Sequence, residues 1–508
     1  MILQKQNIRF RGKTLRFLVT FCSCTGFLLL GYDQGLMSTI VGADNRFGKD
    51  FNHPDSDVQG LLSSVYDLGC CLGSVMCFFV GERAGRRWMM LTGGSTMIVG
   101  TIILASSYTR GQFYVGRIVT GIGNGFNSST IPVYQAECAL AGNRGKMLTY
   151  QAVVTIAGVI IAYWVGYGTS FTDSPVQWRF PCSLQGLFAL ALVIELLTGI
   201  LPETPRWLVT KKRYSEAQEV LAAIFDEDLD SDIVLQEVQD IKTTVDNEAA
   251  GGEFRFGELF EIHNGNLRRL ILSCGIMIMQ QFTGSNMINY YAPIVYQNTM
   301  HLSRNTSLVL GGCCEIVYLV GAFVPVWTID KYGRRTMLFI SSAGLTVCFI
   351  AVSGLLSQER YATSVAASCF VFLYQLFMGV GWLNVWFFPA ELNGTRLRSR
   401  VQAIASFINW LSVFAVVQIT PKAINNIGWR TFIIFAILNF TWIPIVYCFY
   451  PETKGLELED IDHLFDRGGF TGGVFTTRGH PIRPGERRKD IESKAFVVDE
   501  KDHVSFVE

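Results

Sequence analysis

Two short charged motifs decide the fold of this chain: Gly-Glu-Arg-Ala-Gly-Arg-Arg at residues 81–87 and Asp-Lys-Tyr-Gly-Arg-Arg at residues 330–335. Each lies in a brief polar gap between two long apolar runs. In the same way, Pro202-Glu203-Thr204-Pro205-Arg206 corresponds to Pro451-Glu452-Thr453-Lys454-Gly455, and Glu137 corresponds to Glu391. Two repeats of apolar segments with charged hinges at matching places predict a membrane transporter whose binding site lies between the halves.

The composition also places the chain in a lipid bilayer. Of the 508 residues, 50% are hydrophobic and 17% are charged, and the mean hydropathy is +0.30, which excludes an ordinary soluble globule. Most of the 13 cysteines fall inside apolar runs and indicate small buried residues rather than a disulfide framework or a zinc site. Because no paired acid and base is present, we expect neither an enzyme nor a metal or cofactor.

Twelve apolar segments approach the length of about 20 residues that a spanning helix needs. They lie near residues 17–38, 59–80, 88–107, 112–134, 147–168, 182–201, 267–296, 306–329, 336–357, 365–388, 402–420 and 430–450. We therefore predict an all-α membrane protein with twelve transmembrane helices in two six-helix halves. Its expected parts are a cytosolic N-terminus (1–16), an N-terminal bundle (17–201), a cytosolic linker with short helices (202–266), a C-terminal bundle (267–450) and a disordered cytosolic tail (451–508).

Basic residues in the short loops set the orientation. The loops on one side carry Arg83, Arg86, Arg87, Arg144, Lys146, Lys331, Arg334, Arg335, Arg396, Arg398 and Arg400. The first loop on the other side, residues 42–58, carries four Asp residues against Arg46 and Lys49. By the positive-inside rule, both termini are predicted to be cytosolic.

Several motifs, in matching order and spacing, resemble those of the sugar porters of the major facilitator superfamily. They extend from Gly31-Tyr32-Asp33-Gln34-Gly35 to the Pro451 motif and include Gly116-Arg117, Pro202-Glu203-Thr204-Pro205-Arg206-Trp207-Leu208 and Gln280-Gln281-Phe282-Thr283-Gly284. Stretches such as residues 152–168 are similar to fungal members, notably yeast-type glycerol/proton symporters and hexose carriers. The resemblance implies twelve helices, a sugar or polyol as substrate and a place in the plasma membrane.

Asp33 lies inside an apolar segment, where an ionised carboxylate is costly and usually functional. Arg117 in the fourth segment lies at a similar depth and is its natural partner. A protonated Asp33 would release Arg117 and a deprotonated one would hold it, which is the latch that a proton symporter needs. The alternative is a permanent structural ion pair, since uniporting relatives also keep this Asp.

The seventh segment offers neutral donors and acceptors for hydroxyl groups, namely Gln280, Gln281, Asn286 and Asn289. Gln281 and Asn286 are about 140° apart on an ideal helix, so they converge only if the helix breaks near Thr283-Gly284. The alternative role is polar contact between helices. By resemblance, Gln280, Gln281 and Asn286 match sugar contacts of the family, as do Trp386 and the pair Asn409-Trp410.

Three positions around this pocket depart from the family pattern. The Gln expected in the fifth helix would fall at Ala152, so Gln151 is one place early, and it is a weaker candidate for substrate binding. Tyr318 and Val385 replace an Asn and a Pro that many relatives carry. These changes weaken the expectation of a hexose but leave the neutral polar lining.

Charged residues at the predicted cytosolic ends repeat in both halves. Opposite charges at the ends of packed helices can lock one face shut and separate when it opens, so a gate is favoured over an ordinary solvated surface. The candidate gate residues are Glu82, Arg83, Arg86, Arg87, Glu137, Arg144, Glu203, Asp330, Arg334, Arg335, Glu391, Arg396 and Glu452. Gly121-Ile122-Gly123-Asn124-Gly125 resembles a nucleotide loop, but it lies in an apolar segment where small residues allow close helix packing.

The sequence thus predicts a carrier that moves a hexose, pentose or glycerol by alternating access, with protons as the coupling ion. Its expected partners are the small solute and the lipid bilayer, and no nucleic acid. An uncoupled facilitator is the alternative within transport. From another class, the chain could be a sensor that binds sugar and signals.

Overall fold

The structure is a computed structural model that describes residues 9–41, 45–139, 144–249, 254–262, 265–298, 303–358 and 360–454, and the single residues Phe465, Thr471 and Val474. Most of the tail, for which the sequence predicts disorder, lies outside the described residues. So does the beginning of the predicted N-terminal segment.

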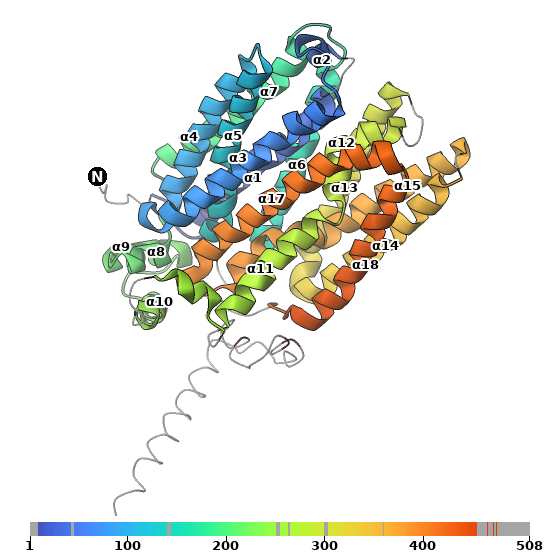
Figure 1. Ribbon diagram of the computed structural model, residues 1–508. Coiled ribbons are helices and arrows are strands. Elements are labelled where there is room, and N and C mark those ends of the chain that lie inside the picture. The colour runs from blue at the N-terminus through green and yellow to red at the C-terminus, as the bar shows by residue number, and fades with distance from the viewer. Residues whose placement is uncertain are drawn as a thin grey trace, which may run out of the picture.

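Six long helices form the N-terminal half, and a short helix α2 (Arg46–Asp50) lies between the first two. They are α1 (Gly12–Ile40), α3 (Ser56–Ala84), α4 (Arg86–Ala105), α5 (Arg110–Cys138), α6 (Arg144–Thr169) and α7 (Val176–Leu197). Helix α1 packs against α6, and α5 packs against both α3 and α4. In Figure 1 these helices run from blue to teal on one side of the molecule.

The C-terminal half repeats the six spans, two of them in pieces. They are α11 (Asn266–Gln281) with α12 (Ser285–Asn298), α13 (Arg304–Tyr332), α14 (Arg334–Leu356), α15 (Tyr361–Val380) with η3 (Trp382–Phe387) and α16 (Phe388–Leu392), α17 (Thr395–Ile427) and α18 (Arg430–Phe449). The halves meet where α17 packs on α3 and α13 packs on α6 (Figure 1).

The all-α architecture with two six-helix halves confirms the predicted fold. Among the described residues, 10 segments are long and apolar enough to cross a membrane. The more polar α5 and the broken pair α11–α12 complete the twelve spans. Several helices extend beyond the apolar segments: α17 covers Thr395–Ile427, whereas its apolar segment is 402–420. Hydropathy marks only the lipid-facing length, while backbone hydrogen bonding continues past it.

The tenth span differs from the single helix predicted at 365–388. Helix α15 ends at Val380, and Gly381 leaves the helical region with φ −129° and ψ −62°. A Cβ at Gly381 would lie 2.5 Å from the carbonyl oxygen of Met337, so the chain approaches the backbone of α14 closely at the break. Because any other residue would place a Cβ in this narrow gap, only glycine fits at position 381.

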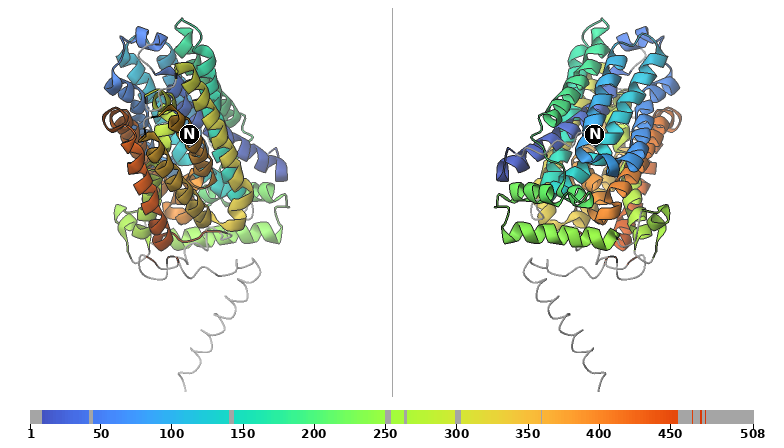
Figure 2. Two further views of the ribbon diagram at one scale, coloured as in Figure 1. Left: turned by 90° about the vertical axis from the view of Figure 1, so that its right-hand side faces the viewer. Right: turned by 90° about the vertical axis from the view of Figure 1, so that its left-hand side faces the viewer.

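Short helices of the linker lie across one end of the long helices (Figure 2). They are α8 (Pro205–Thr210), α9 (Tyr214–Phe225), α10 (Asp232–Ala249) and η2 (Phe256–Phe260), which agrees with the predicted short helices. Arg16 near the start of α1 donates from Nη1 to the carbonyl oxygen of Ile224 in α9 at 2.6 Å. This end of the molecule is called the linker face below.

Glycines set the spacing between α3 and α5. A Cβ at Gly121 would lie 2.9 Å from the Cα of Gly69, and a Cβ at Gly125 would lie 2.8 Å from the Cα of Gly73. The two backbones therefore touch without intervening side chains. This confirms helix packing as the role of the glycines at 121–125.

Candidate substrate site between the two halves

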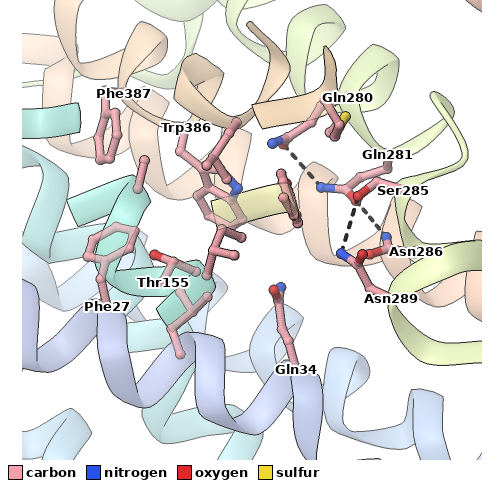
Figure 3. A pocket seen from close by; sticks show the side chains of 16 residues that line it. Phe27, Gln34, Thr155, Gln280, Gln281, Ser285, Asn286, Asn289, Trp386 and Phe387 are labelled. Atoms are coloured by element: carbon pink, nitrogen blue, oxygen red, sulfur yellow. Dashed lines mark hydrogen bonds between the residues drawn. The ribbon is translucent and has the colours of Figure 1, made fainter. Parts of the chain in front are cut away.

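A small cavity lies between the two halves (Figure 3). The N-terminal half lines it with Phe27, Leu30, Gln34, Ala152, Thr155 and Ile156. The C-terminal half lines it with Gln280, Gln281, Ser285, Asn286, Asn289, Tyr318, Met378, Leu383, Trp386 and Phe387. Every lining side chain is neutral, and the polar ones are amides and hydroxyls. The site is therefore suited to an uncharged polar solute.

The break in the seventh span brings the predicted amides together. Helix α11 ends at Gln281, Gly284 takes a positive φ of 97°, and α12 begins at Ser285. Asn286 then donates from Nδ2 to Oε1 of Gln281 at 2.6 Å. The prediction that these two side chains converge only at a broken helix is confirmed.

The amides are held by further hydrogen bonds. Gln280 donates from Nε2 to the carbonyl oxygen of Trp382, the first residue of η3, at 3.0 Å. Gln281 donates from Nε2 to Oδ1 of Asn409 at 2.6 Å. Asn409 is thus placed behind the lining rather than in it. Such bonds fix the amide orientations before any solute arrives, which lowers the ordering cost of binding.

Asn289 belongs to a second chain of polar groups that sequence reasoning missed. Gln375 donates from Nε2 to Oδ1 of Asn289 at 2.8 Å and to Oε1 of Glu315 at 3.4 Å. Glu315 is 1% exposed, and its other carboxylate oxygen has no hydrogen bond. Glu315 lies in the apolar segment 306–329. Like Asp33, it is therefore an acidic residue inside an apolar segment, and the same sequence argument applies to it.

Aromatic rings from both halves close the cavity on the linker side. The rings of Trp386 and Trp410 lie 5.7 Å apart, and Trp410 donates from Nε1 to Oγ of Ser128 in α5 at 3.1 Å. Phe27 of α1 and Phe387 have ring centroids 5.7 Å apart (Figure 3). Phe387 also lines a smaller hollow nearer the linker face, so its ring separates the two spaces.

Gln151 does not line the cavity, although it was a candidate for substrate binding. Its neighbour Ala152 and Thr155 one turn on do line it, while both polar atoms of the Gln151 amide are buried without a hydrogen bond. One residue along a helix rotates the side chain by about 100°, which turns Gln151 away. The polar contribution from the N-terminal half comes instead from Thr155 and from Gln34, which sequence analysis did not single out (Figure 3).

The predicted pair of Asp33 and Arg117 is present and fully buried. Nη1 of Arg117 lies 2.7 Å from Oδ1 of Asp33, and both side chains are 0% exposed. Arg117 also donates from Nη2 to the carbonyl oxygen of Ser63 at 3.2 Å, and its guanidinium lies over the ring of Tyr66. The second oxygen of Asp33 has no hydrogen bond. Neither residue lines the cavity, so the pair can affect a solute only through the helices that carry it.

On the linker face, each half carries the same clamp. In the N-terminal half, Arg86 lies 3.1 Å from Glu137, and Glu203 accepts from the backbone nitrogens of Arg86 and Arg87. In the C-terminal half, the corresponding contacts join Arg334 to Glu391 at 3.2 Å and to Asp330 at 3.4 Å, while Glu452 accepts from the backbone nitrogens of Arg334 and Arg335 at 3.0 Å. The motif repeat noted in the sequence is therefore a repeat of structure.

These clamps bind helices within one half, which changes how the predicted gate works. The charge contacts between halves come from α17: Arg400 forms an ion pair with Glu82 of α3, and Ser399 donates to Glu82 at 3.2 Å. The charge of Arg398 also acts on Glu137. The gate prediction did not include Arg398 or Arg400, because a repeated motif shows which residues correspond and not which ones touch. Arg83 is exposed, and the side chain of Arg144 lies outside the described part of the chain.

Arg396, one of the candidate gate residues, contacts the linker. Its Nη2 and Nε lie 2.6 and 2.8 Å from the two carboxylate oxygens of Glu258 in η2. Burial by itself would raise the pKa of the Glu258 carboxyl, but the hydrogen bonds and charge of Arg396 outweigh it, and the pKa lies below the usual range. The linker is thus tied to the start of α17 by an ionised pair.

Residues 18–465 match the family model described as sugar (and other) transporter. The chain is 36% identical to "Sugar transporter STL1" of Saccharomyces cerevisiae, with 89% of this chain and 82% of that protein covered. It is 34% identical to "Major facilitator superfamily transporter mfsA" of Aspergillus fumigatus, with 97% and 94% covered. The fold is similar to that of the proton:xylose symporter XylE bound to 6-bromo-6-deoxy-D-glucose, with a TM-score of 0.79, 23% identity and 89% and 100% covered.

Together with the twelve spans and the cavity between the halves, these matches define the class: a multi-pass membrane transporter with the major facilitator fold. The chain belongs to the sugar (and other) transporter family of this superfamily.

Proposed function

We propose that this protein carries a neutral polyhydroxylated solute, namely a hexose, a pentose or glycerol, across the membrane by alternating access and in symport with protons. The observation that carries the proposal is the pairing of a neutral, amide-lined cavity with a buried ion pair outside it. The solute and the proton then have separate sites in one set of packed helices.

The lining supports a sugar or polyol over a charged substrate. A carboxylate or phosphate substrate needs a cation to replace its hydration, and the cavity presents amides, hydroxyls and the ring of Trp386 instead. Amides offer both donors and acceptors to hydroxyl groups, and an indole covers the C–H face of a sugar ring. The relative from Saccharomyces cerevisiae is named a sugar transporter, which agrees with this substrate class.

The ion pair supports proton coupling. With Asp33 ionised, Arg117 is held between α1 and α5, and protonation of Asp33 would free the guanidinium. The basic residues in its loops support a cytosolic position for the linker face, in a cell whose plasma membrane holds the protein. Contacts across the halves at Glu82 and Arg400, with the rings of Phe27 and Phe387 above them, then form the cytosolic gate.

The test uses yeast cells that lack their own sugar and glycerol uptake and express the full chain. Labelled D-glucose, D-xylose and glycerol are added in turn to a weakly buffered suspension, and medium pH and uptake are recorded together. Uptake with alkalinisation supports symport. Uptake without alkalinisation makes the protein an uncoupled facilitator, and binding to isolated membranes without any uptake makes it a sensor.

The Asp33→Asn variant sharpens the test. It should abolish accumulation against a gradient and leave exchange of labelled for unlabelled solute, because the neutral side chain mimics the protonated state. Accumulation at the wild-type level would reduce Asp33 and Arg117 to a structural pair.

A further inference from the structure

A second carboxylate, Asp67 of α3, lies beside the pair of Asp33 and Arg117. It is 0% exposed, and neither of its oxygens has a hydrogen bond. The charges of Arg117 and Asp33 both act on it. In the proposed function above, Asp67 has no role.

The guanidinium of Arg117 lies against the part of α3 that carries Asp67. It donates from Nη2 to the carbonyl oxygen of Ser63, one helical turn before Asp67, at 3.2 Å. Close backbone packing holds the two helices together here, since a Cβ at Gly69 would lie 2.4 Å from the carbonyl oxygen of Ile118, the residue after Arg117. Asp67 and Arg117 therefore belong to closely packed stretches of α3 and α5.

The charges in this cluster do not balance. Arg117 carries one positive charge and is already bonded to Asp33. In the described part of the chain no other cation acts on Asp67. A buried carboxylate that has neither a hydrogen bond nor a cation of its own is costly to ionise, and the usual outcome is that it holds a proton.

Asp67 also lies near α12, the second piece of the broken seventh span. Tyr290 and Tyr291 of α12 interact electrostatically with it, and the hydroxyl of Tyr291 donates to the carbonyl oxygen of Val417 in α17 at 3.1 Å. The titratable groups around Asp67 are therefore Asp33 of α1, Arg117 of α5, Tyr290 and Tyr291 of α12, and Cys70 and Cys71 of its own helix.

We propose that Asp67 is a proton-binding site of the transport cycle and carries the proton in the conformation described here, while Asp33 stays ionised against Arg117. When Asp67 loses its proton to water on the linker side, two carboxylates compete for one guanidinium. The competition loosens the bond between α1 and α5 and changes the charge that faces α12. The inference rests on the proposed proton symport and assigns the proton to a second residue.

The experiment compares Asp67→Asn, Asp67→Glu and Asp57→Asn with the wild type in the yeast cells described above, using whichever of D-glucose, D-xylose or glycerol the wild type takes up. Asp57→Asn is the matched control, since it removes a carboxylate from the exposed start of the same helix. Solute-induced alkalinisation, accumulation at steady state and exchange under an uncoupler are measured, with the amount of protein at the cell surface.

We expect Asp67→Asn to lose alkalinisation and to accumulate solute only to the external concentration, while exchange continues. Asp67→Glu and Asp57→Asn should keep alkalinisation. Alkalinisation by Asp67→Asn at the wild-type ratio of protons to solute would overturn the assignment. If Asp67→Asn fails to reach the surface, the rate of uptake by Asp67→Glu is measured as a function of pH. A pH midpoint of uptake that differs from that of the wild type supports the assignment, and an unchanged pH midpoint overturns it. Failure of the proposed function is distinct, because the wild type would then show no alkalinisation.

Discussion

In the N-terminal half, three buried ionisable groups lie outside the cavity on unbroken helices: Asp33 on α1, Asp67 on α3 and Arg117 on α5. In the C-terminal half the buried polar groups are mainly carboxamides, and they stand around the breaks that end α11 and α15. Both halves have six spans, and both carry the same clamp on the linker face. Their interiors have nevertheless diverged in chemistry and in backbone continuity.

The difference follows from what each kind of group requires. A buried ion pair is stable only when its geometry is held closely, which continuous helices and glycine contacts provide. Hydrogen bonds between amides and hydroxyls can be remade with small shifts, so they suit segments that hinge. The break at Gly284 separates α11 from α12, so the amides of the cavity stand on two short helices rather than on one continuous helix.

Glu315 is the exception that limits this comparison. It places a buried carboxyl group in the C-terminal half, and in the described structure the amide of Gln375 donates to it. Through Gln375 it is connected to Asn289 in the cavity lining. The carboxyl groups therefore differ in their partners: Asp33 is paired with a cation, whereas Glu315 contacts an amide.

The largest expected effect comes from breaking the charged interior. Arg117→Leu leaves Asp33 buried without its cation, and removal of one partner of a buried pair costs about 3–5 kcal/mol. The free energy of unfolding of purified protein in mixed micelles measures the loss. The double variant with Asp33→Asn should recover part of it. Arg179→Leu is the control, because in the described structure that side chain bonds backbone carbonyl oxygens and lies over the rings of Tyr108 and Trp178 but is paired with no carboxylate. Equal losses from both arginines would contradict the comparison.

A smaller effect is expected in the amide interior. Gln281→Ala removes the partner of Asn409 and the partner proposed for a hydroxyl group of the solute. The unpaired hydroxyl should weaken solute binding by about 1–3 kcal/mol, or roughly 5- to 150-fold. Equilibrium binding to purified protein measures the change. The free energy of unfolding should also fall, because the buried Asn409 and Asn286 lose their partner. Gln418→Ala removes an amide that bonds Ser64 across the halves outside the cavity, so it should keep the wild-type affinity. An unchanged affinity of Gln281→Ala for each of the three solutes would exclude this cavity.

Hydropathy and motif spacing predict most of this arrangement because its causes are local. A carboxylate or a run of amides inside an apolar segment can be recognised from the sequence alone. The convergence of Gln281 and Asn286 could be predicted from helix geometry and a single break in the helix. Asp67 and Glu315 are also acidic residues inside apolar segments, but neither lies in one of the motifs that resemble the family, and the sequence analysis did not include them.

What the sequence did not predict depends on rotation and on contacts between helices. Gln151 and Ala152 differ by one residue, and only the packing of α6 decides which faces the cavity. The repeat of charges at Arg86 and Arg334 suggested a gate, but whether a clamp lies within a half or across halves is a tertiary property. The break after Val380 likewise depends on close approach to α14.

The smallest expected effect concerns the contact that joins the two halves on the linker face. Arg400→Gln removes the ion pair with Glu82, which is partly exposed and therefore worth about 0.2–1 kcal/mol. The conformation that is open on the linker face should become up to about fivefold more populated. A cysteine introduced at Asn384, in the small hollow beyond Phe387, reports the opening through its rate of labelling by a hydrophilic maleimide applied from the linker face.

The matched control lies at the other end of the same two helices, where Lys422 of α17 pairs with Asp57 of α3. Lys422→Gln removes an equivalent contact on the opposite face, so labelling at position 384 should stay at the wild-type rate or fall. Faster labelling in both variants would mean that the halves simply loosen, whereas faster labelling in Arg400→Gln alone places the gate at Glu82 and Arg400. The clamps within each half would then act as fixed supports against which α3 and α17 separate.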